Sequence, residues 1–140
     1  MDGMDLDEAR AVLREQHHAV LATVKADGTP QLSPVTVGVD AAGHAVISTR
    51  ETAFKTRNLR RDPRVFLCVL PDGFYGGRWI QVSGTAEVVS LPDAMEPLVE
   101  YYRGISGEHP DWDEYRQAMR DQRRVVVRVT LESAGPDRQG

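Results

Sequence analysis

The stretch STRETAFKTRNLRRDPRVFLCVL, residues 48–70, is expected to hold the end of one strand, a short helix and a second strand. The helix is expected to begin after Thr52, whose hydroxyl can cap free backbone N–H groups. It is expected to end before Pro63, because the residue that precedes a proline is kept out of the α region. Residues 65–70 are almost continuously apolar, which is typical of a buried strand.

The sequence on both sides of this stretch continues the strand pattern. Upstream, residues 5–16 predict an amphipathic helix, and strands are expected over residues 19–25, 29–39 and 44–49. Asp27-Gly28 between the first two strands favours a type I′ hairpin turn. Downstream, a strand over residues 78–89 contains Gly84, which predicts a bulge. Helices capped by Ser90 and Asp111 precede a last strand over residues 123–131, and the polar tail from about residue 133 is expected to be loose.

The predicted order of elements decides the fold class. Six strands with hairpin connections favour an antiparallel sheet that is closed or nearly closed, with helices at its flanks. Strands and helices do not alternate in βαβ units, which disfavours a Rossmann fold. A chain of 140 residues is the size of one domain, so residues 1–140 are expected to form a single mainly β domain.

Composition narrows the possible partners and the compartment. The net charge of −4 argues against a nucleic-acid binder, and no apolar run approaches the ~20 residues that a membrane-spanning helix needs. The N-terminus is acidic and lacks the features of a signal peptide. Cys68 is the single cysteine, so no internal disulfide can form, and its apolar neighbours predict a core position. These features together favour a cytoplasmic protein.

Cations are concentrated in one short segment of this acidic chain. Five of them fall within ten residues and are opposed only by Asp62: Lys55, Arg57, Arg60, Arg61 and Arg64. On charge alone, a site for a discrete anion and a solvated helix face both remain open. A helix N-terminus attracts phosphate, and Lys55 and Arg57 can add a point charge and a bidentate fork. The expected phosphate site comprises Ser48, Thr49, Arg50, Lys55, Thr56, Arg57 and Asn58.

A second polar feature lies on the strand over residues 29–39. Gln31 and Ser33 share one face of this strand with Val35 and Val37, by the strand period of two. Such a face can be a solvated rim, or it can line a flat heteroaromatic ring that needs hydrogen bonds at its edge. Both interpretations stay open on these residues alone.

Several other chemistries find no support in the sequence. The four histidines, His17, His18, His44 and His109, form no HExxH motif and have no cysteine partners, so no metal site is expected. There is no GxSxG motif, no P-loop and no GxGxxG motif. Hydrolysis by an activated nucleophile and dinucleotide binding by a Rossmann unit are therefore disfavoured.

Three segments carry a resemblance to a known family. KTRNLRRDPR, residues 55–64, resembles the helix segment of the flavin- and deazaflavin-binding split β-barrels, which include the pyridoxamine 5′-phosphate oxidases. GEHPDWDEYRQAM, residues 107–119, and DGTPQLS, residues 27–33, are similar to the B class of reductases that depend on the deazaflavin coenzyme F420. The resemblance extends from about Asp7 to Leu131 and implies a six-stranded antiparallel split β-barrel of the FMN-binding type.

The resemblance also implies a function. It implies a homodimer with cofactor grooves at the subunit interface, the ring of the cofactor beside Gln31 and Ser33, and its phosphate near residues 48–58. The implied reaction is hydride transfer from reduced F420 to an unsaturated small molecule such as a quinone or an enone. Relatives often carry an arginine where this chain has Ala53, and Arg50 is expected to replace it.

The resemblance leaves the proton donor and the cofactor open. Ser33 and Tyr75 are the candidate proton donors. Trp79 is expected either to cover the ring or to pack in the barrel. An FMN-dependent oxidase or reductase and a non-catalytic F420 carrier are the alternatives to an F420-dependent reductase.

Overall fold

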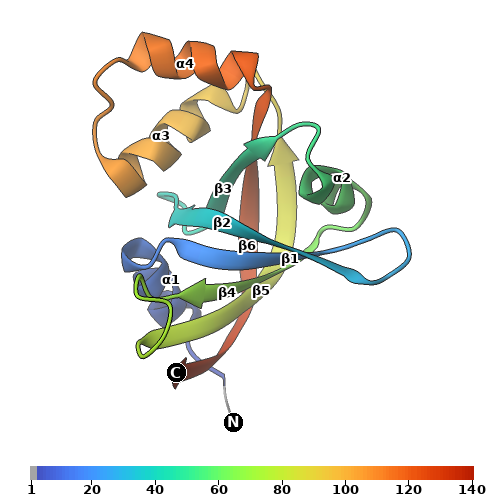
Figure 1. Cartoon of the computed structure of the whole chain (residues 1–140), viewed down its shortest axis with the longest axis vertical. Coiled ribbons are helices and arrows are strands. Elements are labelled where there is room, and N and C mark those ends of the chain that lie inside the picture. The colour runs from blue at the N-terminus through green and yellow to red at the C-terminus, as the bar shows by residue number, and fades with distance from the viewer. Residues whose placement is uncertain (1–2) are drawn as a thin grey trace.

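The computed structural model describes residues 3–140 and has the predicted order of helices and strands (Figure 1). The elements are α1 (Leu6–Glu15), β1 (His18–Val24), β2 (Pro30–Val39), β3 (Ala45–Arg50), α2 (Phe54–Arg61), β4 (Arg64–Leu70), β5 (Arg78–Val89), α3 (Met95–Ser106), α4 (Trp112–Asp121) and β6 (Arg124–Gln139). Within the described residues, no helix is long and apolar enough to cross a membrane.

The six strands form a closed antiparallel barrel in the order β1-β2-β3-β6-β5-β4. Alternate side chains point inward, so Leu21, Ile47, Leu67, Ile80 and Val127 fill the interior and are fully or almost fully buried. The stripe of Ala9, Val12 and Leu13 packs α1 against the same core. The predicted fold class, a six-stranded barrel with flanking helices, is confirmed.

The last strand is longer than predicted. β6 extends to Gln139 and pairs with β5 almost along its whole length, so the prediction of a loose tail from residue 133 is wrong. The tail is polar because much of this strand is exposed, while Ala134 is still buried. The predicted bulge at Gly84 is confirmed by a register shift between Ser83 and Gly84. A Cβ at Gly84 would lie 1.9 Å from the Thr130 carbonyl oxygen, so a side chain has no room there.

Two of the predicted helix caps are wrong. The N-cap of α2 is Ala53, and Thr52 lies in the turn before it. The N-cap of α3 is Ala94, while the Ser90 hydroxyl donates to Glu51 instead. Asp111 caps α4 as predicted, because its carboxylate accepts a hydrogen bond from the Glu114 N–H at 3.1 Å. The Ser90 hydroxyl therefore makes a long-range hydrogen bond in place of capping α3.

The β1–β2 turn also differs from the prediction. Only Gly28 has a positive φ, at 86°, whereas a type I′ turn needs positive φ at both central residues. Asp27 instead holds the turn with its carboxylate, which accepts hydrogen bonds from the N–H and the hydroxyl of Thr29 at 3.0 and 2.6 Å. The hairpin it closes projects beyond the body of the barrel (Figure 1).

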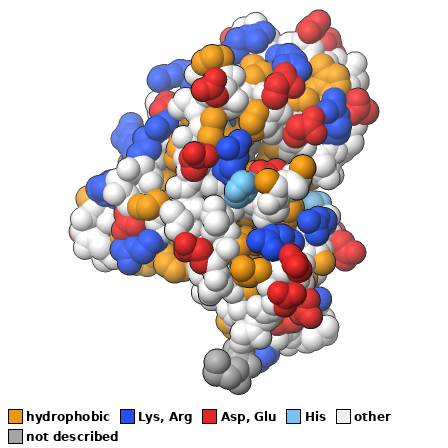
Figure 2. Space-filling model, turned by 180° about the vertical axis from the view of Figure 1, so that it is seen from behind, with side chains coloured by type: hydrophobic (Ala, Val, Ile, Leu, Met, Phe, Trp, Pro, Cys, Tyr) orange, Lys and Arg blue, Asp and Glu red, His pale blue; other side chains and the backbone are white. Residues whose placement is uncertain are grey.

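Helices α3 and α4 form a separate layer on the outside of the barrel, at the end opposite the two chain termini (Figure 1). Leu98, Val99 and Tyr115 of these helices pack on Val46 of β3 and Val126 of β6, whose side chains point outward. From behind, positive and negative side chains are interspersed over the described surface (Figure 2), so that face presents no large patch of one sign. The helix layer leaves part of the barrel wall beside it uncovered.

Candidate functional site

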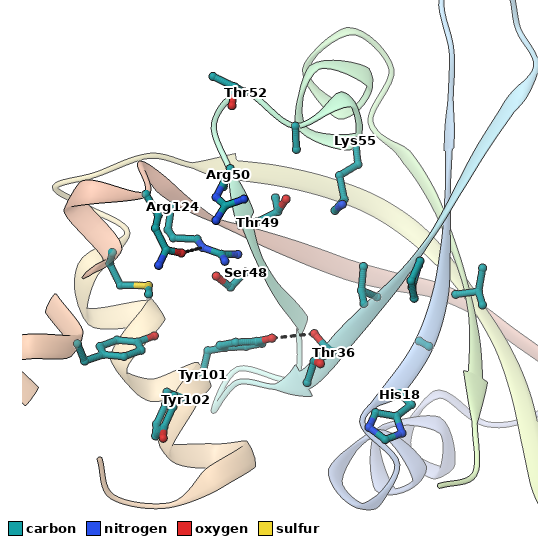
Figure 3. A pocket seen from close by; sticks show the side chains of 18 of the residues that line it. His18, Thr36, Ser48, Thr49, Arg50, Thr52, Lys55, Tyr101, Tyr102 and Arg124 are labelled. Atoms are coloured by element: carbon teal, nitrogen blue, oxygen red, sulfur yellow. Dashed lines mark hydrogen bonds between the residues drawn. The ribbon is translucent and has the colours of Figure 1, made fainter. Parts of the chain in front are cut away.

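A groove of about 970 Å³ lies between the outer wall of the barrel and the helices α3 and α4 (Figure 3). This volume is at the upper end of the range of small-molecule and cofactor sites. The side chains that define its chemistry come from β1, β2, β3, the start of α2, the two helices and the start of β6. They are His18, Pro34, Thr36, Ser48, Thr49, Arg50, Thr52, Lys55, Tyr101, Tyr102, Tyr115, Met119, Gln122 and Arg124.

The groove lies beside the place where the strands β2 and β3 separate. The two strands pair only over Val37–Val39 of β2, whereas β3 remains paired with β6 up to Arg50. Continued in the same register, the next pair would join Thr36 and Ser48. Tyr101 of α3 lies there instead, and its hydroxyl donates a hydrogen bond to the Thr36 carbonyl oxygen at 2.8 Å (Figure 3). A side chain therefore binds the backbone carbonyl at the point where the strand ladder ends.

Tyr101 is embedded in the wall of the groove. Burial is the main influence on its phenol and raises its pKa, while a hydrogen bond with the Ser48 backbone and the positive charge of Arg124 act in the opposite direction. The phenol thus keeps its proton at neutral pH. Tyr101 also lines two smaller cavities, so its side chain lies between them and the groove.

Three cations line the groove: Arg50, Lys55 and Arg124 (Figure 3). Arg50 and Arg124 are direct partners in the β3–β6 ladder. Within the described part of the chain, none of the three has a carboxylate within 4.0 Å, and no aspartate or glutamate lines the groove. The guanidinium of Arg124 donates instead to the neutral Gln122 side chain at 2.8 Å.

The pKa shifts of Lys55 and Arg124 have the same physical cause. Burial, followed by the charge of Arg124, lowers the pKa of Lys55. Burial, followed by the charge of Arg50, lowers the pKa of Arg124. Like charges held together at a partly desolvated site raise the free energy of the free protein, and a bound anion would relieve this repulsion. The groove is therefore built to attract an anion.

Aromatic side chains form the wall opposite the cations. Tyr102 and Tyr115 line the groove and contact each other with ring centroids 5.1 Å apart. Behind them, His109 and Trp112 complete a cluster of mutually contacting rings, and the Arg103 guanidinium lies 5.0 Å from the Trp112 ring. This cluster ties α3 to α4, and it gives the groove a rigid apolar side suited to a flat ring.

Tyr115 is fixed within this wall. Its hydroxyl donates to the Leu98 carbonyl oxygen at 2.8 Å. Burial raises the pKa of Tyr115 to about 12. The hydroxyl is thus committed to the helix behind it, while the ring faces the groove.

The structure brings together four of the predicted phosphate-site residues, because Ser48, Thr49, Arg50 and Lys55 all line the groove. Thr56 lies just behind it and donates to the Arg50 carbonyl oxygen at 2.6 Å, which fixes the turn between β3 and α2. The Arg57 guanidinium lies 5.9 Å from the Phe54 ring, outside the groove lining.

The predicted polar pair on β2 faces another way. The Gln31 Oε1 atom accepts hydrogen bonds from Asn58 at 3.3 Å and from Thr23 at 3.4 Å. Asn58 also donates to the Thr23 hydroxyl at 3.0 Å, so the three side chains form one network that joins α2 to the β1–β2 hairpin. Ser33 is on the same face of β2 as Gln31, and neither of them lines the groove of its own chain.

Tyr75 and Trp79 lie outside the groove lining. Tyr75 is 81% exposed, in the loop between β4 and β5. Trp79 pairs with Arg138 in the β5–β6 ladder, near the chain termini.

Sequence reasoning missed Tyr101, Tyr102 and Arg124 as groove residues. The missed signal for Arg124 was its position as the first residue of a strand, at the same end of the barrel as Arg50.

The described residues contain no group of three or more His, Cys, Asp or Glu side chains arranged to hold a metal ion. His44 is bound to Asp40, with 3.0 Å between the Nδ1 and Oδ2 atoms. Cys68 is only partly buried on the outward face of β4, so the prediction of a core position is wrong, and burial raises the pKa of its thiol.

Comparison with known proteins agrees with this architecture. Residues 6–135 match the family model described as pyridoxamine 5′-phosphate oxidase. This chain belongs to the pyridoxamine 5′-phosphate oxidase family. A relative in this family is the F420H2-dependent biliverdin reductase of Mycobacterium tuberculosis, which is 31% identical over 127 residues that cover 90% of this chain and 83% of the relative.

Solved structures resemble this protein along nearly its whole length. A conserved hypothetical protein of Mycobacterium tuberculosis has a TM-score of 0.75 and 27% identity, with 95% of this chain and 84% of that chain covered. A protein described as an F420 reductase has a TM-score of 0.68 and 22% identity, with 91% and 95% covered. The second likeness shows the shared split-barrel fold alone.

Proposed function

We propose that this member of the pyridoxamine 5′-phosphate oxidase family is an F420-dependent oxidoreductase that reduces an unsaturated small molecule. The observation that carries the proposal is the groove with three uncompensated cations on one side and tyrosines on the other. A deazaflavin cofactor has a flat ring and an anionic chain, which match these two sides. The F420H2-dependent relative supports this choice of cofactor.

The residues of the groove fit such a cofactor. Lys55, Arg50 and Arg124 would hold its phosphate, with the hydroxyls of Ser48 and Thr49 as further hydrogen-bond donors. Tyr102 and Tyr115 would pack against the flat ring of the bound cofactor and exclude water from the reacting atoms. When bound, the reduced deazaflavin supplies the hydride, and the protein contributes binding and orientation. Tyr101 keeps its proton at neutral pH and is coupled electrostatically to Arg124, as Tyr115 also is.

The proposal includes a homodimer. The outward faces of β4, β1 and β2 form an apolar surface next to the groove, on which Leu32 is 64% exposed and Phe66 is 37% exposed. Both residues are ladder partners of Ala22. In the adjoining row Val20 pairs with Pro34, and both also line the groove. A second copy on this surface would bury the apolar side chains and close the open side of the groove.

The dimer also bears on the predicted site residues that lie outside the groove. Tyr75 and Trp79 would reach cofactor or acceptor only in a groove shared with a second copy. Sedimentation at low micromolar concentration tests this part of the proposal. A species that is only monomeric and still binds F420 tightly would contradict it.

The decisive experiment is a pair of binding titrations of the purified protein, one with F420 and one with FMN. Tighter binding of F420 is expected, and tighter binding of FMN would overturn the choice of cofactor. Stopped-flow mixing of the reduced F420 complex with quinones, enones and biliverdin then tests the reaction. Oxidation by at least one acceptor class is expected. Oxidation by none of them, with F420 still bound, would favour a cofactor carrier.

A further inference from the structure

A second cavity of about 310 Å³ adjoins the groove. It is lined by Glu51, Ser90, Leu91, Arg123 and Arg124. Arg124 lines both this cavity and the groove, so its side chain lies between the two spaces. A ligand that extends from the groove past the Arg124 guanidinium would reach the second cavity.

Arg123 is held in an unusual backbone conformation at this cavity. It follows the C-cap of α4 with a φ of 51°, in the left-handed region that glycine or asparagine usually occupies at a helix end. Its backbone is fixed on both sides, because its N–H donates to the Arg120 carbonyl at 3.1 Å and its carbonyl accepts from the Glu51 N–H at 2.8 Å. Within residues 3–140, its exposed guanidinium has no ion pair or hydrogen bond.

The one carboxylate in the cavity does not neutralise this charge. Glu51 is bound to the Arg60 guanidinium at 2.6 Å and accepts a hydrogen bond from the Ser90 hydroxyl at 3.0 Å. The Nη2 atom of Arg60 thus already has two partners, Glu51 and Ser90. Arg61 donates to the Val24 carbonyl oxygen and to the Asn58 side chain, at 2.9 and 3.0 Å. Among the cations near the groove, Arg123 is therefore better placed than Arg60 or Arg61 to meet a further anionic group.

We propose that Arg123, together with Arg124, forms a second anion subsite that binds a carboxylate of the ligand held in the groove. This inference rests on the proposed function, since it assigns a subsite to the same ligand. A carboxylate can come from two sources: the glutamate tail of F420, or an acidic substituent of the acceptor. Arg123 is exposed, so the subsite adds a modest, salt-sensitive increment to binding.

Binding isotherms with three deazaflavins distinguish the sources: one without phosphate and tail, one with the phosphate and no glutamate, and one with several glutamates. If the tail occupies the subsite, affinity for the wild-type protein rises roughly two- to fivefold on adding glutamates, as expected for an exposed ion pair. In Arg123→Gln that gain disappears, while affinity for the phosphate form without glutamates is unchanged. Arg120→Gln, which removes the same charge one helical turn earlier, is expected to retain the gain.

A second arm tests the acceptor as the source. Biliverdin, with its two carboxylates, and its dimethyl ester are compared by KM, and by equilibrium binding to the complex with oxidised cofactor. If the acceptor occupies the subsite, Arg123→Gln weakens binding of the free acid to the level of the ester and leaves kcat unchanged. If Arg123→Gln changes neither the tail-length series nor the acid–ester difference, the inference is overturned although F420 still binds. If the wild-type protein binds no deazaflavin, the proposed function fails as well.

Discussion

The two ends of β6 use arginine in opposite ways. At its start, Arg124 lies across the ladder from Arg50, and neither has a carboxylate partner within the described chain. Near its end, the Asp137 carboxylate accepts two hydrogen bonds from the Arg78 guanidinium, at 2.8 and 2.7 Å. The like charges of Arg50 and Arg124 repel each other, whereas the opposite charges of Arg78 and Asp137 attract each other. One strand thus contributes to stability at one end and prepares a binding site at the other.

The pKa shifts follow the same division. Hydrogen bonds from Arg78 hold the pKa of Asp137 below its ordinary value and raise the pKa of Arg78. At the other end, burial and the neighbouring arginine lower the pKa of Arg124. The comparison predicts that changes at the Arg50–Arg124 end alter ligand affinity, whereas changes at the Arg78–Asp137 end alter the free energy of unfolding.

The largest expected effect is on affinity. Lys55→Ala should weaken F420 binding roughly tenfold or more, because a charge-assisted hydrogen bond to a phosphate contributes about 1.5–3 kcal/mol. The measurement is a fluorescence titration with F420. Arg64→Ala is the matched control, since Arg64 is exposed and bound to Asp62, whose pKa it lowers to about 2. Equal losses in the two variants would mean that the basic segment acts as a diffuse field.

The pH dependence of that affinity has a definite sign. A bound phosphate stabilises protonated Lys55, and burial and Arg124 lower the pKa of Lys55 in the free protein. Affinity should therefore fall as pH rises through a value below the ordinary lysine pKa of about 10.4. Lys55→Arg should retain binding through this range, because arginine stays charged. The same titration repeated from neutral to alkaline pH measures both curves.

A smaller effect is expected at the point where β2 and β3 separate. Tyr101→Phe should lower the free energy of unfolding by about 1 kcal/mol, since it leaves the Thr36 carbonyl without its donor. Tyr102→Phe is the control, because the Tyr102 hydroxyl makes no hydrogen bond within the described residues. Urea unfolding measures the stability of both variants. Amide exchange at Ser48 should also change in Tyr101→Phe only; identical exchange in the two variants would contradict the role assigned to Tyr101.

The fold was largely predictable from sequence, because strand alternation and turn residues are local signals. The groove was only partly predictable. Lys55 could be identified because it starts a short helix among other cations, whereas Tyr101 becomes a groove residue only when α3 packs on the outside of β3. That packing depends on Val46 and Val126 pointing away from the barrel core, which a run of valines does not reveal.

Charge neutralisation was likewise hidden from sequence. Arg60 is compensated by Glu51, nine residues earlier, and Arg78 by Asp137, 59 residues later. The basic composition of residues 55–64 therefore did not show which cations stay available to a ligand. The length of β6 was missed for a related reason, since half of a strand that pairs on a barrel surface faces water and has a polar composition.

Removing the Arg78–Asp137 ion pair near the end of β6 should reduce stability modestly. Asp137→Asn is expected to lower the free energy of unfolding by a few tenths to about 1 kcal/mol, because the ion pair is bidentate but partly exposed to solvent. The folded-state pKa of Asp137 is lowered, so its stabilisation is present above the unfolded value of about 3.9 and is lost as pH falls through the lower folded value. Urea unfolding at neutral and strongly acidic pH should show a difference from the wild type only at neutral pH. Asp121→Asn, at the exposed end of α4, is expected to show a smaller effect.

The smallest expected effect gives the sharpest test of the comparison, because its sign is unusual. Arg50→Gln removes one of two facing cations and breaks no side-chain hydrogen bond within the described residues. The free protein should therefore keep its stability or gain a few tenths of a kcal/mol, as like charges directly across a ladder are destabilising. The gain should be largest at low ionic strength and should vanish when salt screens the pair over a Debye length of about 10 Å or less. Urea unfolding without ligand at two salt concentrations measures it, with Arg120→Gln as a control for the change in net charge.

Affinity for F420 should fall in Arg50→Gln, as expected where a binding site is maintained at the expense of stability. A loss of stability in Arg50→Gln, with F420 affinity unchanged, would show that the Arg50–Arg124 end of β6 serves the fold and not the ligand.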